Sequence, residues 1–132
     1  MEQTVAEMTA VNPNVKSRIV PLDLKQAKTE DYAHLLDAGK HTIVVNNAGI
    51  IDRQKFFEVP LEKIEDLIKT NVHPYVLLSK YATLHFREHK DSHYHKNALI
   101  HVSSIVADTV IPFHFTYSTY GATKAFNLAF AH

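Results

Sequence analysis

The chain has 132 residues, its 14 basic and 14 acidic side chains cancel, and it contains no cysteine. Balanced charge argues against direct binding to nucleic acid or to an anionic membrane, because both partners require a field of one sign. The absence of cysteine excludes disulfides, thiolate nucleophiles and cysteine-ligated metals, and no apolar run approaches the roughly 20 residues of a membrane span. We therefore expect a single soluble domain, residues 1–132, in a reducing compartment such as the cytoplasm.

The first quarter of the chain predicts a helix, a strand and a second helix. Apolar spacing favours a short helix over residues 2–11. Residues 17–24 have the pattern of a buried strand, although Pro21 favours an edge position or a strand end. A helix over residues 25–38 follows, and Asp23 could cap it.

A second strand leads into a short polar corner. The β-branched run from Thr42 to Val45 predicts a fully buried parallel strand. It continues directly into the tetrapeptide Asn46, Asn47, Ala48 and Gly49. Adjacent amides can cross-link strand ends, and Ala and Gly leave the backbone bare enough for a flat ligand. An isolated tetrapeptide of this kind is also compatible with an ordinary turn.

A long helix with an internal irregularity comes next. Apolar positions recur at helical spacing from Leu61 to Phe86, and Asn71 lies on the apolar stripe. Pro74 cannot donate to the carbonyl of Thr70, so we expect a kink beside Asn71. A buried amide needs partners, which makes Asn71 either a satisfied core residue or a functional one.

The last third of the chain combines a hydroxyl, a phenol and an amine. A third strand, residues 97–104, ends in Ser103 and Ser104, and Tyr120 precedes Lys124 by four residues. In a helix this step places phenol and ammonium on one face, where the cation favours the phenolate and allows proton transfer near neutral pH. An isolated pair of this kind is more often an exposed cation beside a half-buried ring.

These motifs resemble the short-chain dehydrogenase/reductase family, in which a serine precedes a Tyr-x-x-x-Lys helix and Asn-Asn-Ala-Gly follows a buried strand. The resemblance implies that Tyr120 is the general acid/base, that Lys124 lowers its pKa, and that Ser104 orients the substrate oxygen. It also implies that Asn71 completes a catalytic tetrad. The family places its tyrosine about thirteen residues after the serine, where Tyr117 stands here. We choose Tyr120 because it alone has a lysine four residues later.

The resemblance also implies a fold and a cofactor. The fold would be α/β, a partial Rossmann-like doubly wound parallel sheet of three strands with flanking helices. The cofactor would be NADP or NAD, with NADP slightly favoured, and the substrate a small carbonyl compound or alcohol. The segment Y-G-A-T-K-A-F is similar to the hydroxysteroid and long-chain 3-oxoacyl-CoA reductase branch, but it does not select a substrate. The residues implied in cofactor binding are Asp23, Leu24, Asn47, Ala48, Gly49, Tyr120 and Lys124.

The chain lacks one hallmark of the family. Members open with a Gly-x-x-x-Gly-x-Gly turn that receives the cofactor phosphates, and the three glycines here are not so arranged. We expect the chain to begin at the family's second helix, to end before its last two strands, and to fold marginally alone. The alternative to an NAD(P)-dependent oxidoreductase is therefore a truncated pseudoenzyme that acts through protein contacts. A homo-oligomer is compatible with both hypotheses.

A histidine cluster offers a different hypothesis. His85 and His89 stand four residues apart and could share a helix face as zinc ligands, with His93 or His95 completing the site. The surrounding segment is polar, however, and lies between a helix and a strand. We interpret it as a solvated loop and predict no metal site.

Overall fold

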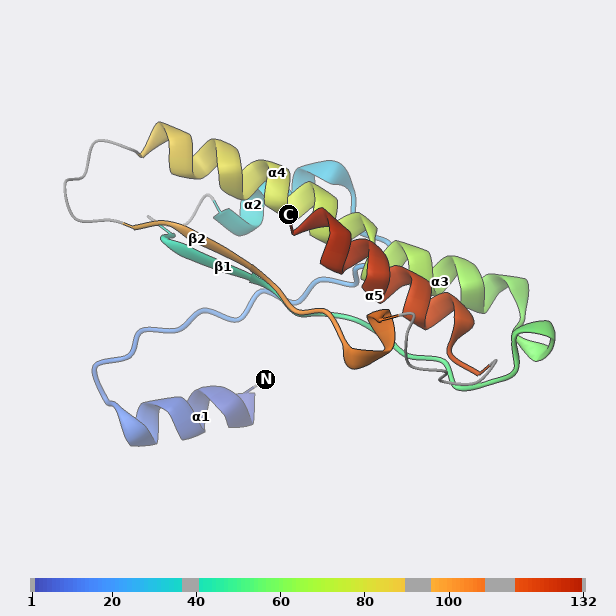
Figure 1. The fold of residues 1–132 in the computed structure, drawn as a ribbon. Coiled ribbons are helices and arrows are strands. Elements are labelled where there is room, and N and C mark those ends of the chain that lie inside the picture. Colours follow the sequence, from blue (N-terminus) through green and yellow to red (C-terminus); the bar gives the residue numbers. More distant parts are fainter. Residues whose placement is uncertain (1, 37–40, 90–95, 109–115, 132) are drawn as a thin grey trace.

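The computed structural model describes residues 2–36, 41–89, 96–108 and 116–131. Figure 1 shows an α/β arrangement in which helices flank a small parallel sheet. In chain order the elements are α1 (Glu2–Val11), α2 (Thr29–Leu36), β1 (Ile43–Asn46), the 3-10 turn η1 (Phe56–Glu58), α3 (Leu61–Asn71), α4 (His73–Glu88), β2 (Ala98–His101), the 3-10 turn η2 (Ile105–Ala107) and α5 (Ser118–Phe130).

The sheet confirms the predicted α/β class. β1 and β2 pair in parallel, with Ile43 opposite Ala98 and Asn46 opposite His101. A further backbone bond, from Val102 N to Asn46 O at 2.9 Å, holds together the carboxyl ends of the two strands. Since α3 and α4 form the crossover between the strands, the residues after both strands open at the same edge of the sheet.

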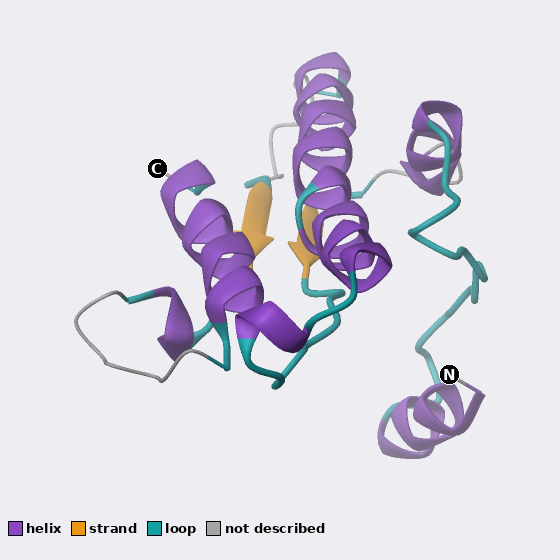
Figure 2. Ribbon diagram, turned by 90° about the vertical axis from the view of Figure 1, so that its right-hand side faces the viewer, coloured by secondary structure: helices purple, strands orange, loops and turns teal. Residues whose placement is uncertain are grey.

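The first predicted strand, residues 17–24, does not form. Residues 15–23 have no regular secondary structure, and this stretch runs apart from both strands in Figure 2. A strand needs a neighbour for its backbone groups, and within the described ranges none lies beside this segment. Pro21 also lacks the N–H that a sheet ladder uses. The sheet of the described residues therefore has two strands, whereas the sequence predicted three.

The predicted helices form, with different ends. The helix expected over residues 25–38 begins later, at Thr29, after a turn in which Asp31 accepts a 2.7 Å bond from Lys28 N. The long helix is divided at Val72, whose backbone angles of −113° and −58° depart from those of an ideal helix. The break lies beside Asn71, where Pro74 predicted a kink.

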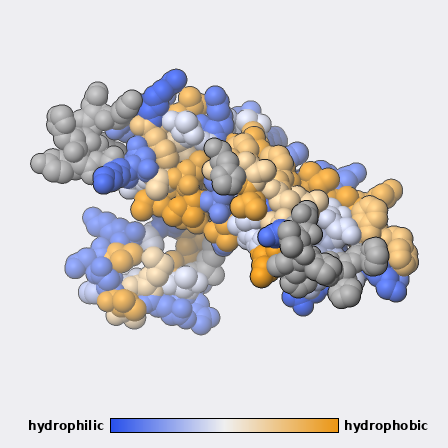
Figure 3. Space-filling model, in the orientation of Figure 1, coloured by the Kyte–Doolittle hydropathy of each residue, from blue (hydrophilic) through white to orange (hydrophobic). Residues whose placement is uncertain are grey.

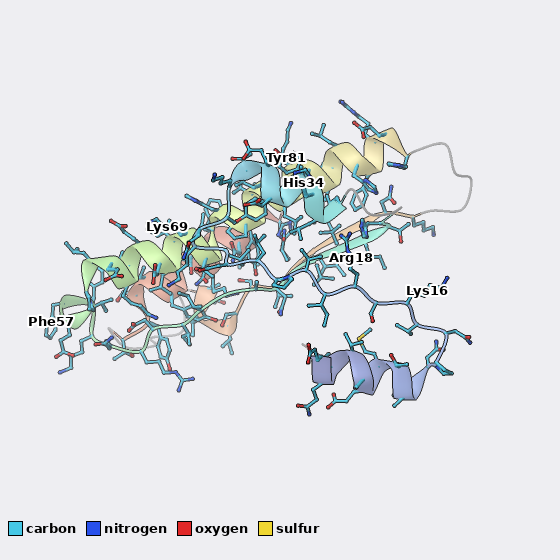
Figure 4. The ribbon with its side chains drawn as sticks, turned by 180° about the vertical axis from the view of Figure 1, so that it is seen from behind. Lys16, Arg18, His34, Phe57, Lys69 and Tyr81 are labelled. Carbon is cyan, nitrogen blue, oxygen red and sulfur yellow. The ribbon has the colours of Figure 1, made fainter. Side chains whose placement is uncertain are left out.

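The core lies between the sheet and the helices α2 and α4. Val44 of β1 packs with Leu36 and Ala82, and Leu78, Tyr81, Phe86 and Leu99 surround them. Tyr81 and His34, labelled in Figure 4, mark where α4 and α2 lie side by side. The other face of the sheet is exposed to solvent. Its side chains Ile43, Val45 and Ile100 are 58%, 51% and 46% exposed. Figure 3 shows the resulting hydrophobic surface over the strands.

The N-terminal helix does not contribute to this core. α1 buries none of its residues and lies apart from the other helices in Figures 1 and 2. The chain that leaves it carries Lys16 and Arg18 along an exposed path, visible in Figure 4. None of the helices in the described ranges combines the length and apolarity that crossing a membrane demands.

Candidate active site

Asn71 connects the segments that form the site through the hydrogen bonds of its side chain. Its side chain is fully buried, and its Oδ1 accepts a 2.8 Å bond from Ile50 N while its Nδ2 donates to Ile50 O at 2.9 Å. The same Nδ2 also donates to Thr123 Oγ1 at 3.1 Å. One amide therefore joins the loop after β1, the break between α3 and α4, and helix α5. This is the arrangement of a buried polar group whose hydrogen bonds are satisfied.

Lys124 brings a buried cation to the same place. The residue is 4% exposed, and its Nζ donates to Val102 O at 3.0 Å and to Tyr75 OH at 3.4 Å. Burial lowers the pKa of its ammonium group, because the low-dielectric surroundings disfavour the charged form. An ammonium group has three N–H donors, and these two bonds leave one that can meet a ligand oxygen.

Tyr120 lies one helical turn before Lys124 on α5. The Nζ of Lys124 is 5.9 Å from the centroid of the Tyr120 ring, and the Tyr120 side chain is half-buried. Tyr117, the other tyrosine considered from the sequence, precedes the first turn of α5, with its ring 6.5 Å from that of Tyr120. Phenol and ammonium therefore share one side of the helix, where the cation can act on the ionisation of the phenol.

The two serines have different neighbours. Ser103 Oγ donates to Lys124 O at 2.7 Å, which joins the end of β2 to α5. Ser104 Oγ accepts a 3.4 Å bond from Val106 N and caps the turn η2. That turn packs on Gly121, where an added Cβ would lie 3.1 Å from Val106 O. Ser104 therefore begins the turn that packs on α5 at Gly121, and within the described ranges no hydrogen bond joins its hydroxyl to that of Tyr120.

The Asn-Asn-Ala-Gly corner approaches this cluster through its glycine. A Cβ on Gly49 would lie 3.1 Å from Asn71 Oδ1 and 3.7 Å from Lys124 Nζ, so a larger residue would press on both groups. The other two residues of the corner, Asn47 and Ala48, are exposed to solvent. Asn46 is the buried amide of the corner: its Nδ2 donates to Ser79 Oγ of α4 at 3.0 Å and lies 3.3 Å from His101 Nδ1 of β2.

A hollow of about 260 Å³ lies beside the corner. It is largely apolar, and its lining includes Leu22, Leu24, Tyr32, Val45, Asn47 and Ala48. Asp23 is exposed and caps the adjacent turn: its carboxylate accepts from Lys25 N at 3.0 Å and from Gln26 Nε2 at 3.2 Å. Of these two residues, both implied in cofactor binding by the family resemblance, Leu24 lines the hollow and Asp23 caps the turn in which Leu24 lies.

Two members of the cluster were missed by the sequence reasoning. Thr123 donates to Tyr120 O at 2.7 Å and accepts from Asn71, and Tyr75 contacts Lys124. Helical spacing offered a signal for Thr123, which follows Tyr120 by three residues. The role of Tyr75 depends on the end of β2 and on α5, which meet only in the folded chain.

The zinc hypothesis gains no support. The described residues contain no group of three His, Cys, Asp or Glu side chains able to hold a metal ion. The rings of His85 and His89 are 4.3 Å apart, while His93 and His95, the other two residues in this hypothesis, fall outside the described residues.

Solved structures share this fold. A bulky-bulky ketone specific alcohol dehydrogenase from Comamonas testosteroni matches with a TM-score of 0.81 at 22% identity, covering 98% of this chain and 50% of that one. A short-chain dehydrogenase from Sphingobium yanoikuyae in complex with NADPH also matches with a TM-score of 0.81. Its identity is 26%, over 98% of this chain and 48% of that one. The chain thus spans about half the length of these relatives.

Sequence comparison agrees with the fold. A very-long-chain 3-oxoacyl-CoA reductase from Coccidioides immitis (strain RS) is 29% identical over 76 residues, which cover 54% of this chain and 22% of that protein. The family model described as short chain dehydrogenase matches residues 1–132. The chain belongs to the short-chain dehydrogenase family.

Proposed function

We propose that the chain carries the catalytic centre of an NAD(P)-dependent oxidoreductase that interconverts a carbonyl compound and an alcohol, with Tyr120 as general acid/base. The observation that carries this proposal is the buried ammonium of Lys124, held 5.9 Å from the Tyr120 ring centroid by neutral oxygen acceptors. A cation that is not neutralised by a carboxylate stabilises a phenolate nearby. A phenol tuned in this way can exchange a proton near neutral pH.

Each polar residue then has a defined task. Tyr120 removes the proton from an alcohol during oxidation and returns it to the oxygen during reduction. The hydroxyl of Ser104, at the turn packed beside Gly121, orients the substrate oxygen. Asn71 holds the loop after β1 against α5, which fixes the distance between the Gly49 corner and Lys124.

The residues fit a nicotinamide dinucleotide. Gly49 leaves open the space that a Cβ would fill between Asn71 and Lys124, and the free N–H of Lys124 suits a ribose hydroxyl. The hollow lined by Leu24, Asn47 and Ala48 suits a flat adenine ring. When bound, the cofactor supplies or accepts the hydride. We favour NADP slightly over NAD, in keeping with the NADPH bound to the Sphingobium yanoikuyae relative.

Cofactor binding provides the first test. Purified chain is titrated into NADPH and into NADH while nicotinamide fluorescence is followed. We expect saturable binding that Lys124→Met weakens by about tenfold, the loss of one good hydrogen bond. Lys69→Met is the matched control, because Lys69 lies on the outer side of α3, paired with Glu65 at 3.0 Å (Figure 4). Absence of binding at millimolar cofactor would refute the proposal for this chain.

Turnover provides the second test. Assays begin with a 3-oxoacyl thioester, the substrate class named for the Coccidioides immitis relative, and with a bulky ketone. Tyr120→Phe should reduce turnover by at least ~100-fold, the usual contribution of a general acid/base, without a comparable loss of cofactor binding. Near-normal turnover in this variant would reject the role of Tyr120.

The alternative is a pseudoenzyme that acts through protein contacts. Its support is the bare apolar face of the sheet, with Ile43 and Val45 more than half exposed. It predicts a chain that remains folded but binds neither cofactor, so the fluorescence titration also separates these two hypotheses.

A further inference from the structure

Tyr75 contacts the cation of the candidate site from the helix opposite. It lies on α4 and is 1% exposed. Its hydroxyl donates to Val102 O at 2.7 Å and accepts a 3.4 Å bond from Lys124 Nζ. The same Nζ is 5.6 Å from the centroid of the Tyr75 ring. Since the single phenolic proton is given to Val102 O, the lone pairs of the hydroxyl oxygen are left for the ammonium.

The position of Tyr75 is fixed independently of Lys124. Its ring stacks on His101 of β2, with centroids 5.6 Å apart and an interplanar angle of 28°. Its backbone carbonyl accepts from Asn46 Nδ2 at 3.4 Å and from the hydroxyl of Ser79. The side chain is therefore held by the strands and by its own helix, and Lys124 meets a preformed acceptor.

We propose that Tyr75 is a positioning residue that holds the Lys124 ammonium at the carboxyl end of β2, on the side of α5 that carries Tyr120. The proposal rests on the proposed function only in its last step, from the position of the ammonium to turnover. Tyr75 and Val102 O together replace water around the buried cation. Removal of the Tyr75 hydroxyl leaves Val102 O as the one described acceptor for Lys124.

The ionisation of these groups is consistent with this role. Burial raises the pKa of Tyr75, and the charge of Tyr120 raises it further, so Tyr75 stays a neutral hydrogen-bond partner at pH 7. Lys124 is faced by Tyr75 from α4 and by Tyr120 from its own helix, and His101 contacts the far side of the Tyr75 ring. Within the described ranges no aspartate or glutamate pairs with Lys124.

The direct test is an NMR titration of the Lys124 side chain in the isolated 132-residue chain, without cofactor. Lysine labelled at Cε and Nζ gives a resonance that reports the Lys124 pKa. Tyr75→Phe removes an acceptor from the charged form and should lower that pKa by about half a unit or more. Tyr32→Phe is the matched control, because Tyr32 is also 1% exposed but lies on α2, and it should leave the Lys124 pKa unchanged.

Two outcomes of this titration would overturn the proposal. One is a Lys124 pKa that is equal in Tyr75→Phe and in the parent chain while the α5 resonances are retained. The other needs no variant, and so applies even if Tyr75→Phe does not fold: absence, in the parent chain, of a nuclear Overhauser effect between the ε-methylene of Lys124 and the ring protons of Tyr75. Observation of that effect together with the lowered pKa supports the proposal.

A pH profile extends the test to turnover. If Tyr75 positions Lys124, Tyr75→Phe weakens the stabilisation of the Tyr120 phenolate. The pH at which alcohol oxidation reaches half its maximal rate should then rise, while Tyr81→Phe on the same helix should not shift it. Failure of the chain to bind NADPH or NADH would refute the proposed function. The NMR titration would still decide the role of Tyr75.

Discussion

The N-terminal segment, residues 2–24, and the cluster around Asn71 and Lys124 are held in different ways. α1 forms from local helical preference and buries none of its residues. In the cluster, Asn71 is fully buried and Lys124 is 4% exposed, and their partners come from the segments that follow β1 and β2 and from the helices α4 and α5. The comparison teaches that a short helix without tertiary contacts depends on local interactions and is only marginally stable. A buried polar site, in contrast, requires several distant segments to pack together.

Among the replacements that introduce no proline into the backbone, the largest effect is expected at the centre of the cluster. Asn71→Leu keeps the branched shape of the side chain but leaves the N–H and C=O of Ile50 without their partner. We expect a loss of about 3 kcal/mol in the free energy of unfolding, because each abandoned buried polar group costs about 1–3 kcal/mol. Urea denaturation followed by circular dichroism measures it.

The matched control is Asn14→Leu in the N-terminal segment. Asn14 is exposed, so we expect its replacement to change the free energy of unfolding by no more than about 0.5 kcal/mol. Equal losses in the two variants would remove the distinction between the two regions.

Replacement of a second buried amide should change the free energy of unfolding in the opposite direction. Asn127 on α5 is fully buried, and within the described ranges neither its Nδ2 nor its Oδ1 meets a hydrogen-bond partner. Asn127→Leu removes this uncompensated polarity, keeps the branched shape of the side chain and should stabilise the chain by about 1 kcal/mol. A lower denaturation midpoint in this variant would show that the amide has a partner essential to the packing.

Acid should lower the stability of the folded chain, because His101 is partly buried in the packed region. Burial lowers the pKa of this residue, so below about pH 6.5 the unfolded chain binds a proton that the folded chain resists. Stability therefore falls as the pH decreases from about 6.5 towards the lowered pKa. His101→Phe keeps a ring against Tyr75 and should reduce this pH dependence, measured as the melting temperature at pH 7.5 and 5.5. The control is His73→Phe, at an exposed position, which should leave the pH dependence of the melting temperature unchanged.

The smallest effect is expected in α1. Proline inside a helix costs about 3 kcal/mol of helix stability, yet Ala6→Pro should change global unfolding by no more than about 0.5 kcal/mol. The reason is that α1 can unfold without disturbing the core. Ala82→Pro, at a fully buried position of α4, should prevent folding. A large loss on Ala6→Pro would reveal contacts of α1 that support the core.

These differences also explain which features were predictable. The helix over residues 2–11 and the break beside Asn71 were predicted, because apolar spacing and Pro74 act locally. The prediction of a strand over residues 17–24 was wrong. An apolar run becomes a strand only when a neighbouring strand supplies hydrogen-bond partners for its backbone N–H and C=O groups. Tyr75 was missed because its significance depends on the end of β2 and on α5, which meet only in the folded chain.

The most direct test of the central claim is native-state amide hydrogen exchange, resolved residue by residue by NMR. The amides of Ile50 and Val102, bonded to Asn71 Oδ1 and Asn46 O, should exchange at least ~100-fold more slowly than in an unfolded chain. Amides of α1 should exchange within about tenfold of the unfolded rate. Protection of α1 equal to that of α4, or an Ile50 amide that exchanges at the unfolded rate, would contradict the account.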